Sequence, residues 1–204
     1  MAKDWVRENS AELAKDFYSE NYDEAVSEFT LGRLQSYYLA QAELAVPAVR
    51  ALQYAQSLMP RFHQGALVFA VTATELTVKN VLLRPIISGL VHSEDLASLI
   101  ADLTTDQAGM DRFHKLLTGI LSQYGGFQLK SFKRVGSVRT LWEEMFEVQK
   151  ARNGLIHRGD PTEEATAGLS IDVAHTLLVH IFPTILTRLG LHIHTPLRIC
   201  GQAH

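Results

Sequence analysis

The stretch Ala151–Asp160 reads ARNGLIHRGD and closes a helical pattern that begins at Leu141. Apolar residues recur along this pattern at alternating spacings of four and three, which places them on one face of an α-helix. Arg152 falls on that face, where the pattern asks for an apolar residue, and a guanidinium there requires a partner or a ligand. Asn153 and His157 lie one turn apart on the neighbouring row. The sequence therefore predicts three polar groups on one otherwise buried face.

A simpler interpretation covers part of the same stretch. Helices commonly end in basic residues, which the negative end of the helix dipole favours, with Gly just past the last turn and Pro soon after. The sequence follows that order with His157, Arg158, Gly159 and Pro161. Capping therefore accounts for Arg158 and Gly159, and it competes with a chemical role for His157. It does not account for Arg152, which lies more than a turn further in.

Length and composition limit the class of protein. The chain has 204 residues, 47% of them hydrophobic and 20% charged, as expected of a folded globular protein with one main core. The net charge of -3 argues against coating nucleic acid by bulk charge, so contact with RNA or DNA requires a local patch. Cys200 is the single cysteine, and the N-terminus lacks the apolar core of a signal peptide. We expect a cytoplasmic protein that does not span a membrane.

Residues 1–30 differ in composition from the rest of the chain. They hold eight acidic residues against three basic ones, together with several aromatic residues. This composition predicts an acidic helical N-terminal extension that docks on another surface, with the charges forming a solvated face. The remaining residues, 31–204, are expected to form the main helical domain.

Helical spacing of apolar residues recurs through that domain, and no strand alternation is long enough to build a sheet. The pattern predicts an all-α fold, a bundle of about four or five main helices. The expected helices are Leu31–Ala55, bent or divided at Pro47; Arg61–Leu83, ended by Arg84 and Pro85; Glu94–Leu103; Met110–Gln123; Val138–His157, capped by Ser137; and Ile171–Leu189, interrupted by Pro183. An extended apolar tail follows, from Leu191 to Cys200.

The expected helix Arg61–Leu83 is apolar around nearly its whole circumference, which predicts the central buried helix. Glu75 and Lys79 are its two charged interior residues. Because they are four residues apart, they suit an ion pair with each other. The alternative is that Glu75 faces the site around Arg152.

The stretch Phe127–Arg139 contains four basic residues and no acidic one. Aromatic side chains are interleaved with the cations, a combination that favours contact with RNA. The alternative is a basic loop that serves solubility alone. The RNA-binding candidates in this stretch are Lys130, Lys133, Arg134 and Arg139.

The nine histidines do not show the spacing of a metal site. His175 and His180 are five residues apart, and no helical His-Glu-x-x-His motif is present. The sequence also lacks a Gly-rich phosphate loop and a Gly-x-Ser-x-Gly motif. We therefore expect no metal and no other cofactor.

Arg152 and His157 together suit metal-independent cleavage of RNA. A neutral imidazole can take the proton from a ribose 2′-hydroxyl, and a guanidinium can stabilise charge on the phosphate. Five residues turn an ideal helix by about 500°, so the two side chains lie about 140° apart. Either the helix loosens near Gly154, or the two groups flank a composite site shared with a second copy of the chain.

At these residues the chain resembles the HEPN superfamily, all-helical proteins of which many are metal-independent ribonucleases. Their signature is Arg followed after four to six residues by His, often with a polar residue directly after the Arg; here Arg152 and His157 have four residues between them. The order of elements is similar too, because the motif closes a long helix after an apolar helix that contains Glu75. The likeness covers about Leu31 to Leu191.

The resemblance implies a homodimer whose two motifs face each other. It implies catalytic roles for Arg152, Asn153 and His157, and products with 2′,3′-cyclic phosphate and 5′-hydroxyl ends. We add Glu75 and Arg158 as candidate supporting residues. The resemblance also implies a toxin or a phage-defence effector with an antitoxin or regulatory partner. Some family members carry a Tyr, modified by a partner nucleotidyltransferase, at the position that Gly159 occupies here.

Three hypotheses follow from the sequence. The first is an RNA endonuclease with an Arg/His motif. The second is a non-catalytic helical module that binds a nucleotide or a protein through the same pocket. The third is a structural dimer in which Arg152 pairs with Glu75.

Overall fold

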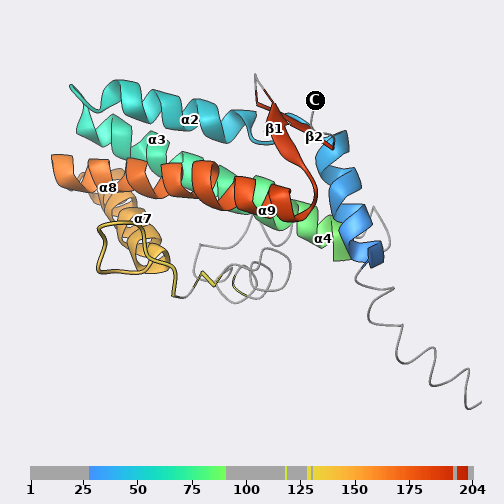
Figure 1. Cartoon of the computed structure of the whole chain (residues 1–204). Helices are drawn as coiled ribbons and strands as arrows, with labels where there is room; N and C mark the ends of the chain where they lie inside the picture. Colours follow the sequence, from blue (N-terminus) through green and yellow to red (C-terminus); the bar gives the residue numbers. More distant parts are fainter. Residues whose placement is uncertain (1–27, 91–117, 119–127, 130, 195–196, 202–204) are drawn as a thin grey trace, which may run out of the picture.

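The computed structural model describes residues 28–90, 118, 128–129, 131–194 and 197–201 (Figure 1). Within these ranges the protein is mostly helical, and the one sheet is a two-stranded hairpin. The expected all-α character is confirmed. Residues 1–27 of the expected extension, and the helices expected at 94–103 and 110–123, lie outside the described residues, apart from residue 118.

A helix at 28–40 opens the described chain, and a turn at 41–45 separates it from α2 (Val46–Leu58). Residues 28–30, which the sequence placed in the extension, form the first turn of that helix. The expected division of the first helix at Pro47 is confirmed. Pro47 lies in the first turn of α2, where a missing N–H costs no helical hydrogen bond.

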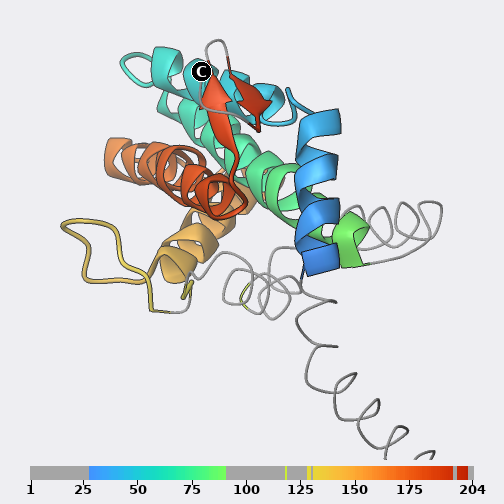
Figure 2. The same cartoon turned by 45° about the vertical axis from the view of Figure 1, so that its right-hand side comes forward.

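The central rod consists of α3 (His63–Leu76), the π-helix η1 (Thr77–Leu83) and α4 (Arg84–Leu90), which follow one another without a break. Figures 1 and 2 both show this rod running through the middle of the molecule, with α2 beside its α3 end. Its buried side chains lie on all sides, and they include Ala66, Leu67, Ala70, Val71, Val78, Val81, Leu82 and Leu83. The expected central buried helix is confirmed.

The expected end of this helix at Arg84 and Pro85 is wrong. In η1 the hydrogen bonds span five residues, and the N–H of Arg84 donates to the carbonyl of Lys79. The carbonyl of Val81 stands four residues before Pro85, which has no N–H to give it. The hydroxyl of Tyr38, in helix 28–40, donates to that carbonyl at 2.8 Å. The rod therefore continues past the proline because a π-helical turn and a distant phenol replace the lost bond.

The second rod consists of α8 (Glu164–His175), the π-helix η2 (Thr176–Ile181) and α9 (Phe182–Arg188). Its expected start at Ile171 is wrong by about two turns, since α8 begins at Glu164. Pro183 does not interrupt it either. As in the central rod, a π-helix precedes the proline, and the N–H of Phe182 donates to the carbonyl of Leu177.

Both rods are long and apolar enough to cross a membrane by length and composition. The share of the most apolar window buried inside the protein is 61% for His63–Gly89 and 56% for Glu164–Arg188. Helices in the core of a folded protein have the same character. Length and hydropathy alone therefore do not identify either rod as a membrane span.

The helix α7 (Leu141–Arg158) carries the sequence stretch of interest. Ser137 was expected to cap it, but Thr140 does so. Thr140 accepts a hydrogen bond from the N–H of Glu143, and the Glu143 carboxylate accepts one from the N–H of Thr140 at 2.8 Å. This reciprocal capping box fixes the start of α7.

The tail beyond α9 forms a hairpin of β1 (His192–His194) and β2 (Arg198–Cys200). The strands are antiparallel, with His192 opposite Cys200. The expectation that the chain contains no sheet is wrong here, because three-residue strands are too short to show an alternating pattern. The N–H of Ile199 donates to the carbonyl of Ala42 at 2.9 Å, which joins the hairpin to the turn before α2.

The helix α7 packs against both rods through one apolar stripe. Val148 of α7 lies in a buried cluster with Leu67 and Val71 of α3 and Ala167 of α8, and Leu155 packs against the same cluster. Leu141 and Met145, nearer the start of α7, belong to the largest core cluster. The last turns of α7 therefore lie beside α3 at the edge of the core.

Candidate functional site

The Arg152 network consists of four side chains from α3 and α7. The Arg152 guanidinium forms an ion pair with Glu75 of α3 through Nη2, and its Nη1 donates to Asn153 Oδ1 at 3.0 Å. The amide of Gln149 donates to the same Glu75 oxygen at 2.9 Å. Glu75 thus faces the candidate site. Among the described residues no ion pair joins it to Lys79, so the interpretation of a Glu75–Lys79 pair is wrong.

The predicted buried face is only partly correct. Arg152 occupies the apolar register as expected, but its side chain is 22% exposed and that of Glu75 is 26% exposed. Asn153 is half-buried and turns to Arg152, whereas His157 is exposed. The reason is the position of Arg152, one turn beyond Val148, where α7 reaches the edge of α3.

The helix α7 stays α-helical from Leu141 to Arg158, through Gly154. Of the two arrangements considered from the sequence, a helix that loosens near Gly154 is therefore excluded. Arg152 and His157 remain on different sides of one regular helix. A single copy of the chain does not bring them onto one substrate atom.

The end of α7 confirms the capping interpretation for Gly159. Gly159 has a φ of 70°, in the left-handed region, and its N–H donates to the carbonyl of Leu155 at 3.0 Å. Arg158 forms an ion pair with Asp160, and both side chains are well exposed. Among the described residues, no hydrogen bond or ion pair joins Arg158 to Arg152 or Glu75. The structure therefore gives no support to a catalytic role for Arg158.

In the basic loop 131–140, which precedes α7, both arginines form ion pairs with carboxylates. Arg134 donates through Nε to Glu144 at 2.6 Å and through Nη1 to Asp172 at 3.1 Å. Ser137 donates to Glu144 at 2.7 Å, and Glu144 is 3% exposed. The hydrogen bond to Glu144 raises the pKa of Arg134 above its ordinary value. Burial of the guanidinium lowers that pKa, but by a smaller amount.

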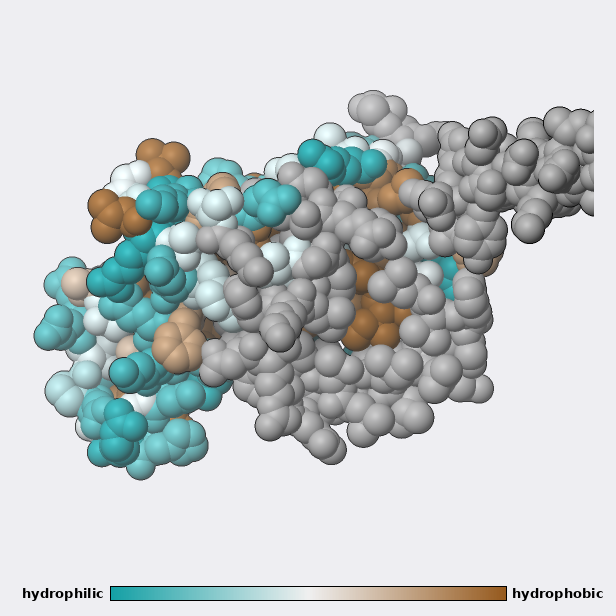
Figure 3. All heavy atoms as spheres, turned by 90° about the horizontal axis from the view of Figure 1, so that it is seen from below, coloured by the Kyte–Doolittle hydropathy of each residue, from teal (hydrophilic) through white to brown (hydrophobic). Residues whose placement is uncertain are grey.

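The other RNA-binding candidates differ from Arg134. Lys133 is exposed, Arg139 pairs with Glu147, and Lys130 lies outside the described residues. The left-hand part of the face in Figure 3, over α7 and this loop, is mostly hydrophilic with a few hydrophobic side chains. The basic stretch thus faces the acidic first turns of α7, and RNA contact here stays a prediction.

Four of the described histidines form two ring pairs. The rings of His175 and His180 lie 5.7 Å apart, because a π-helical turn brings residues five positions apart onto one side. The rings of His192 and His194 lie 4.9 Å apart on β1. In the part of the chain that the structure describes, no group of three or more His, Cys, Asp or Glu is placed to hold a metal ion.

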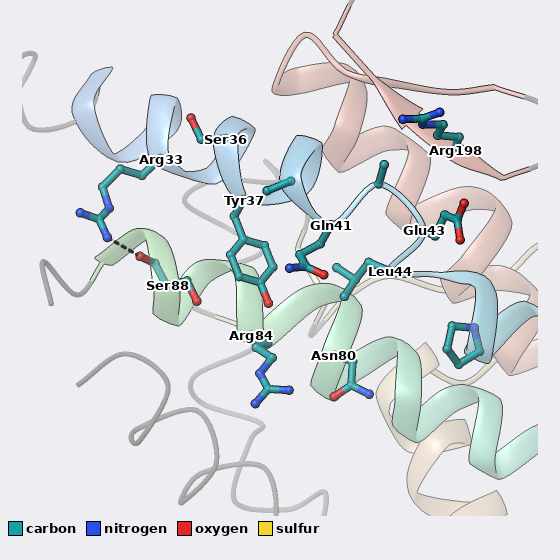
Figure 4. Close-up of a pocket in the computed structure, with 13 residues that line it drawn as sticks. Arg33, Ser36, Tyr37, Gln41, Glu43, Leu44, Asn80, Arg84, Ser88 and Arg198 are labelled. Carbon is teal, nitrogen blue, oxygen red and sulfur yellow. Dashed lines mark hydrogen bonds between the residues drawn. The ribbon is translucent and has the colours of Figure 1, made fainter. Parts of the chain in front are cut away.

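Sequence reasoning missed a second candidate site, the arginine cleft. It measures about 1230 Å³ and lies between helix 28–40, the turn 41–45, η1, α4 and β2. Figure 4 shows Tyr37 and Gln41 side by side on one wall of the cleft, with Asn80 and Arg84 on the neighbouring helical rod. A signal was present: Gln41 interrupts the apolar rhythm of the first helix, and Asn80 and Arg84 are one turn apart.

No protein-family model matches the sequence, and neither a curated protein nor a solved structure gives a significant match. The resemblance to the HEPN superfamily therefore rests on Arg152, Asn153 and His157 and on their place in α7. The chemistry of both candidate sites follows from the residues of this chain.

Proposed function

We propose that the protein is a metal-independent RNA endonuclease that acts as a homodimer through Arg152, Asn153 and His157. The observation that carries this proposal is the geometry of Arg152. Glu75 and Asn153 hold its guanidinium at the edge of the core, while His157 stands exposed just over one turn further along the same regular helix. Two copies of α7 facing each other supply both groups to one phosphate.

Arg152 keeps the capacity to bind a phosphate while it is held. A guanidinium has five N–H groups, and the bonds to Glu75 and Asn153 use one each. The other N–H groups serve a phosphate oxygen, and they stabilise the charge that builds on it in the transition state. Glu75 and Asn153 are positioning residues, because they fix the guanidinium without touching the substrate.

The proposed reaction needs RNA and two histidines. Nε2 or Nδ1 of one His157 takes the proton of the ribose 2′-hydroxyl, and the 2′-oxygen attacks the adjacent phosphorus. The bond from phosphorus to the 5′-oxygen breaks, and His157 of the partner subunit gives that oxygen a proton. The products are a 2′,3′-cyclic phosphate and a 5′-hydroxyl. DNA lacks the attacking hydroxyl, so it is not a substrate.

The exposed face of α7 supports the dimer. Phe146 is 48% exposed and Ile156 is 55% exposed, and both lie on the side of α7 that Asn153 shares. Large apolar side chains around a polar site are typical of a surface that a second chain covers. We infer that the two-fold axis passes near this face, so that the two motifs meet across it.

The same contacts also favour a second function, a non-catalytic module. Two hydrogen bonds join α7 to α3, from Gln149 and Arg152 to Glu75, and such contacts can serve the stability of the fold alone. In that case His157 has no role in the stability or the binding of the protein. Measuring RNA cleavage by a His157 variant separates the two functions.

The test uses purified full-length protein and structured RNA in EDTA. For the parent we expect cleavage with 2′,3′-cyclic phosphate ends, and for His157→Ala a rate lower by about 10²–10⁴. His180→Ala, which removes another exposed histidine, is the matched control and keeps the parental rate. Equal cleavage by the parent and His157→Ala points to a contaminating nuclease and contradicts the proposal. RNA left intact by the parent contradicts it for that substrate.

The dimer has its own test. Ile156→Glu is expected to give a monomer in sedimentation velocity and to lose cleavage, because a buried unpaired carboxylate opposes association. Val179→Glu is the control, since Val179 is similarly exposed at 48% but lies on η2. A monomeric parent that cleaves RNA contradicts the composite site.

A further inference from the structure

The outward face of α3 lies between α2 and α7. Figures 1 and 2 both place α2 above α3 and α7 below it, and α3 also contacts α8. From Gly65 onward, the residues of α3 that are not fully buried recur at helical spacing and share one side. They are Val68, Phe69, Thr72, Glu75 and Leu76. This outward face runs from the contact with α2 to the contact with α7.

An aromatic pair lies at the α2 edge of the outward face. The rings of Tyr54, on α2, and Phe69 are 5.5 Å apart and tilted by 49°. Tyr54 remains 57% exposed and Phe69 remains 38% exposed. A tilted pair at this distance is a favourable contact that leaves ring surface open to solvent. Open aromatic rings are the feature on which unpaired nucleic-acid bases stack.

The charge beside the aromatic pair suits a phosphate backbone. The sequence between Glu43 and Glu75 contains no acidic residue, whereas it contains two arginines. One of them, Arg50, is exposed one turn before Tyr54 on α2, and within the described ranges no ion pair joins it to a carboxylate. The carboxylate of Glu75 is paired with Arg152. Although the chain has a net charge of -3, this surface is locally basic.

The outward face leads to the arginine of the proposed catalytic site. Phe69 and Glu75 are six residues apart, which separates them by about 9 Å along an ideal helix and by about 120° around it. The short turn 59–62 joins α2 to α3, and the two helices run in opposite directions (Figure 1). Arg50 therefore lies beside the part of α3 between Phe69 and Glu75. A strand that leaves the aromatic pair and passes Arg50 reaches the Arg152 guanidinium, which is bound to Glu75.

We propose that the outward face of α3 binds an unpaired stretch of the RNA substrate next to the cleaved phosphate. One base stacks on Tyr54 and Phe69, and Arg50 binds a backbone phosphate between that base and Arg152. The inference rests on the proposed function, because it takes the cleaved phosphate to lie at Arg152. Duplex RNA does not suit this face, since its bases are paired and stacked on one another. The substrate class is therefore single-stranded RNA or an unpaired loop.

Fluorescence anisotropy with an uncleavable strand measures binding apart from cleavage. The probe is a labelled 2′-O-methyl RNA of about 12 nucleotides without self-complementarity, used alone or annealed to its complement. Its methyl groups block the attacking hydroxyl. We expect the full-length protein to bind the single strand more tightly than the duplex. Equal affinity for the duplex overturns the single-strand assignment, and no saturable binding of either probe overturns the site.

Variants locate the binding. Tyr54→Ala is expected to weaken single-strand binding about 5–100-fold, as for the loss of one stacking ring, while Tyr54→Phe keeps the ring and the affinity. Arg50→Gln is expected to weaken it several-fold. The matched controls are Phe29→Ala, an aromatic residue 54% exposed on helix 28–40, and Arg188→Gln, exposed on α9. Equal losses in the controls, or none in Tyr54→Ala and Arg50→Gln, contradict the proposal.

Cleavage kinetics separate this proposal from the proposed function. With an unmodified RNA of the probe sequence, Tyr54→Ala is expected to raise KM with little change in kcat, because stacking away from the reacting atoms binds ground state and transition state alike. If the parent cleaves RNA and Tyr54→Ala leaves both KM and probe affinity unchanged, the outward-face site alone is wrong. If the parent binds the probe through Tyr54 but cleaves no RNA, the binding face stands and the nuclease proposal is wrong.

Discussion

Arg134 lies in the loop before α7 and Arg152 lies near the end of α7, and the surroundings of the two side chains differ. Arg134 meets two carboxylates, and the nearer one, Glu144, has a side chain only 4% exposed. Arg152 meets one carboxylate, Glu75, that is 26% exposed, and an amide. Both arginines were candidates for contact with RNA. The comparison shows that the burial of the partner separates an arginine that holds the fold from one that is open to a ligand.

The physical reason is the cost of a charge left without a partner. A carboxylate buried at the level of Glu144 cannot be solvated if its cation is removed, so the arginine is required for folding. Glu75 reaches water, so it tolerates the loss of Arg152. We therefore expect Arg134 to serve stability and Arg152 to serve chemistry.

The largest expected effect is that of Arg134→Gln. It leaves Glu144 buried without its ion pair, and the free energy of unfolding is expected to fall by about 3–5 kcal/mol. Urea denaturation measures it. Adding Glu144→Gln to this variant removes the buried charge and is expected to recover much of the loss. If Arg134→Gln lowers the free energy of unfolding by less than Arg152→Gln does, the contrast between the two arginines is wrong.

Tyr38→Phe tests whether burial has the same effect on a neutral group. The variant leaves the carbonyl of Val81 without the donor that replaces the missing N–H of Pro85. We expect a loss of about 1–3 kcal/mol in urea denaturation, as for a buried acceptor left unsatisfied. Tyr37→Phe is the control, because its half-buried hydroxyl faces the cleft. Equal losses in the two variants contradict the role given to Val81.

Thr140→Ala removes an exposed cap and is expected to cost about 1 kcal/mol. Its pH dependence follows from Glu143, whose pKa is lowered, first by the backbone N–H and then by the hydroxyl of Thr140. A lowered pKa stabilises the folded state above the ordinary value of 4.5, and that stability is lost as the pH falls. The difference in the free energy of unfolding between the parent and Thr140→Ala should shrink below that pH. A constant difference contradicts the hydroxyl contribution.

The smallest expected effect on stability is that of Arg152→Gln. Because Arg152 and Glu75 are both partly exposed, their ion pair contributes about 0–1 kcal/mol to the free energy of unfolding. Thermal melting of the parent, Arg152→Gln and Glu75→Gln measures it. A loss comparable to that of Arg134→Gln makes Arg152 a structural residue and supports the non-catalytic module.

The sequence predicted the helical class and the position of α7 because apolar spacing is a local signal. It misjudged both prolines for a related reason. A proline ends a regular α-helix, but here a π-helical turn precedes Pro85 and another precedes Pro183, and the donor for Val81 comes from Tyr38, far away in the chain. The residues near Pro85 in the sequence therefore give no indication of that donor.

The candidate site shows the same limit. The polar register of Arg152 was visible in the sequence, and a partner was required, but the choice of Glu75 over a ligand depends on how α3 and α7 pack. The basic loop was read without the acids of α7 that neutralise Arg134. The cleft around Arg84 is formed by segments that only the fold brings together.

The most direct test of the division between the two arginines is the rate of RNA cleavage per folded molecule. It compares Arg152→Gln with the Arg134→Gln, Glu144→Gln double variant at a temperature where both are folded. We expect Arg152→Gln to lose about 10²–10³ in rate, as for removal of a group that stabilises transition-state charge. The double variant should stay within a few-fold of the parent. Equal losses in both, or an unchanged rate in Arg152→Gln, contradict the account.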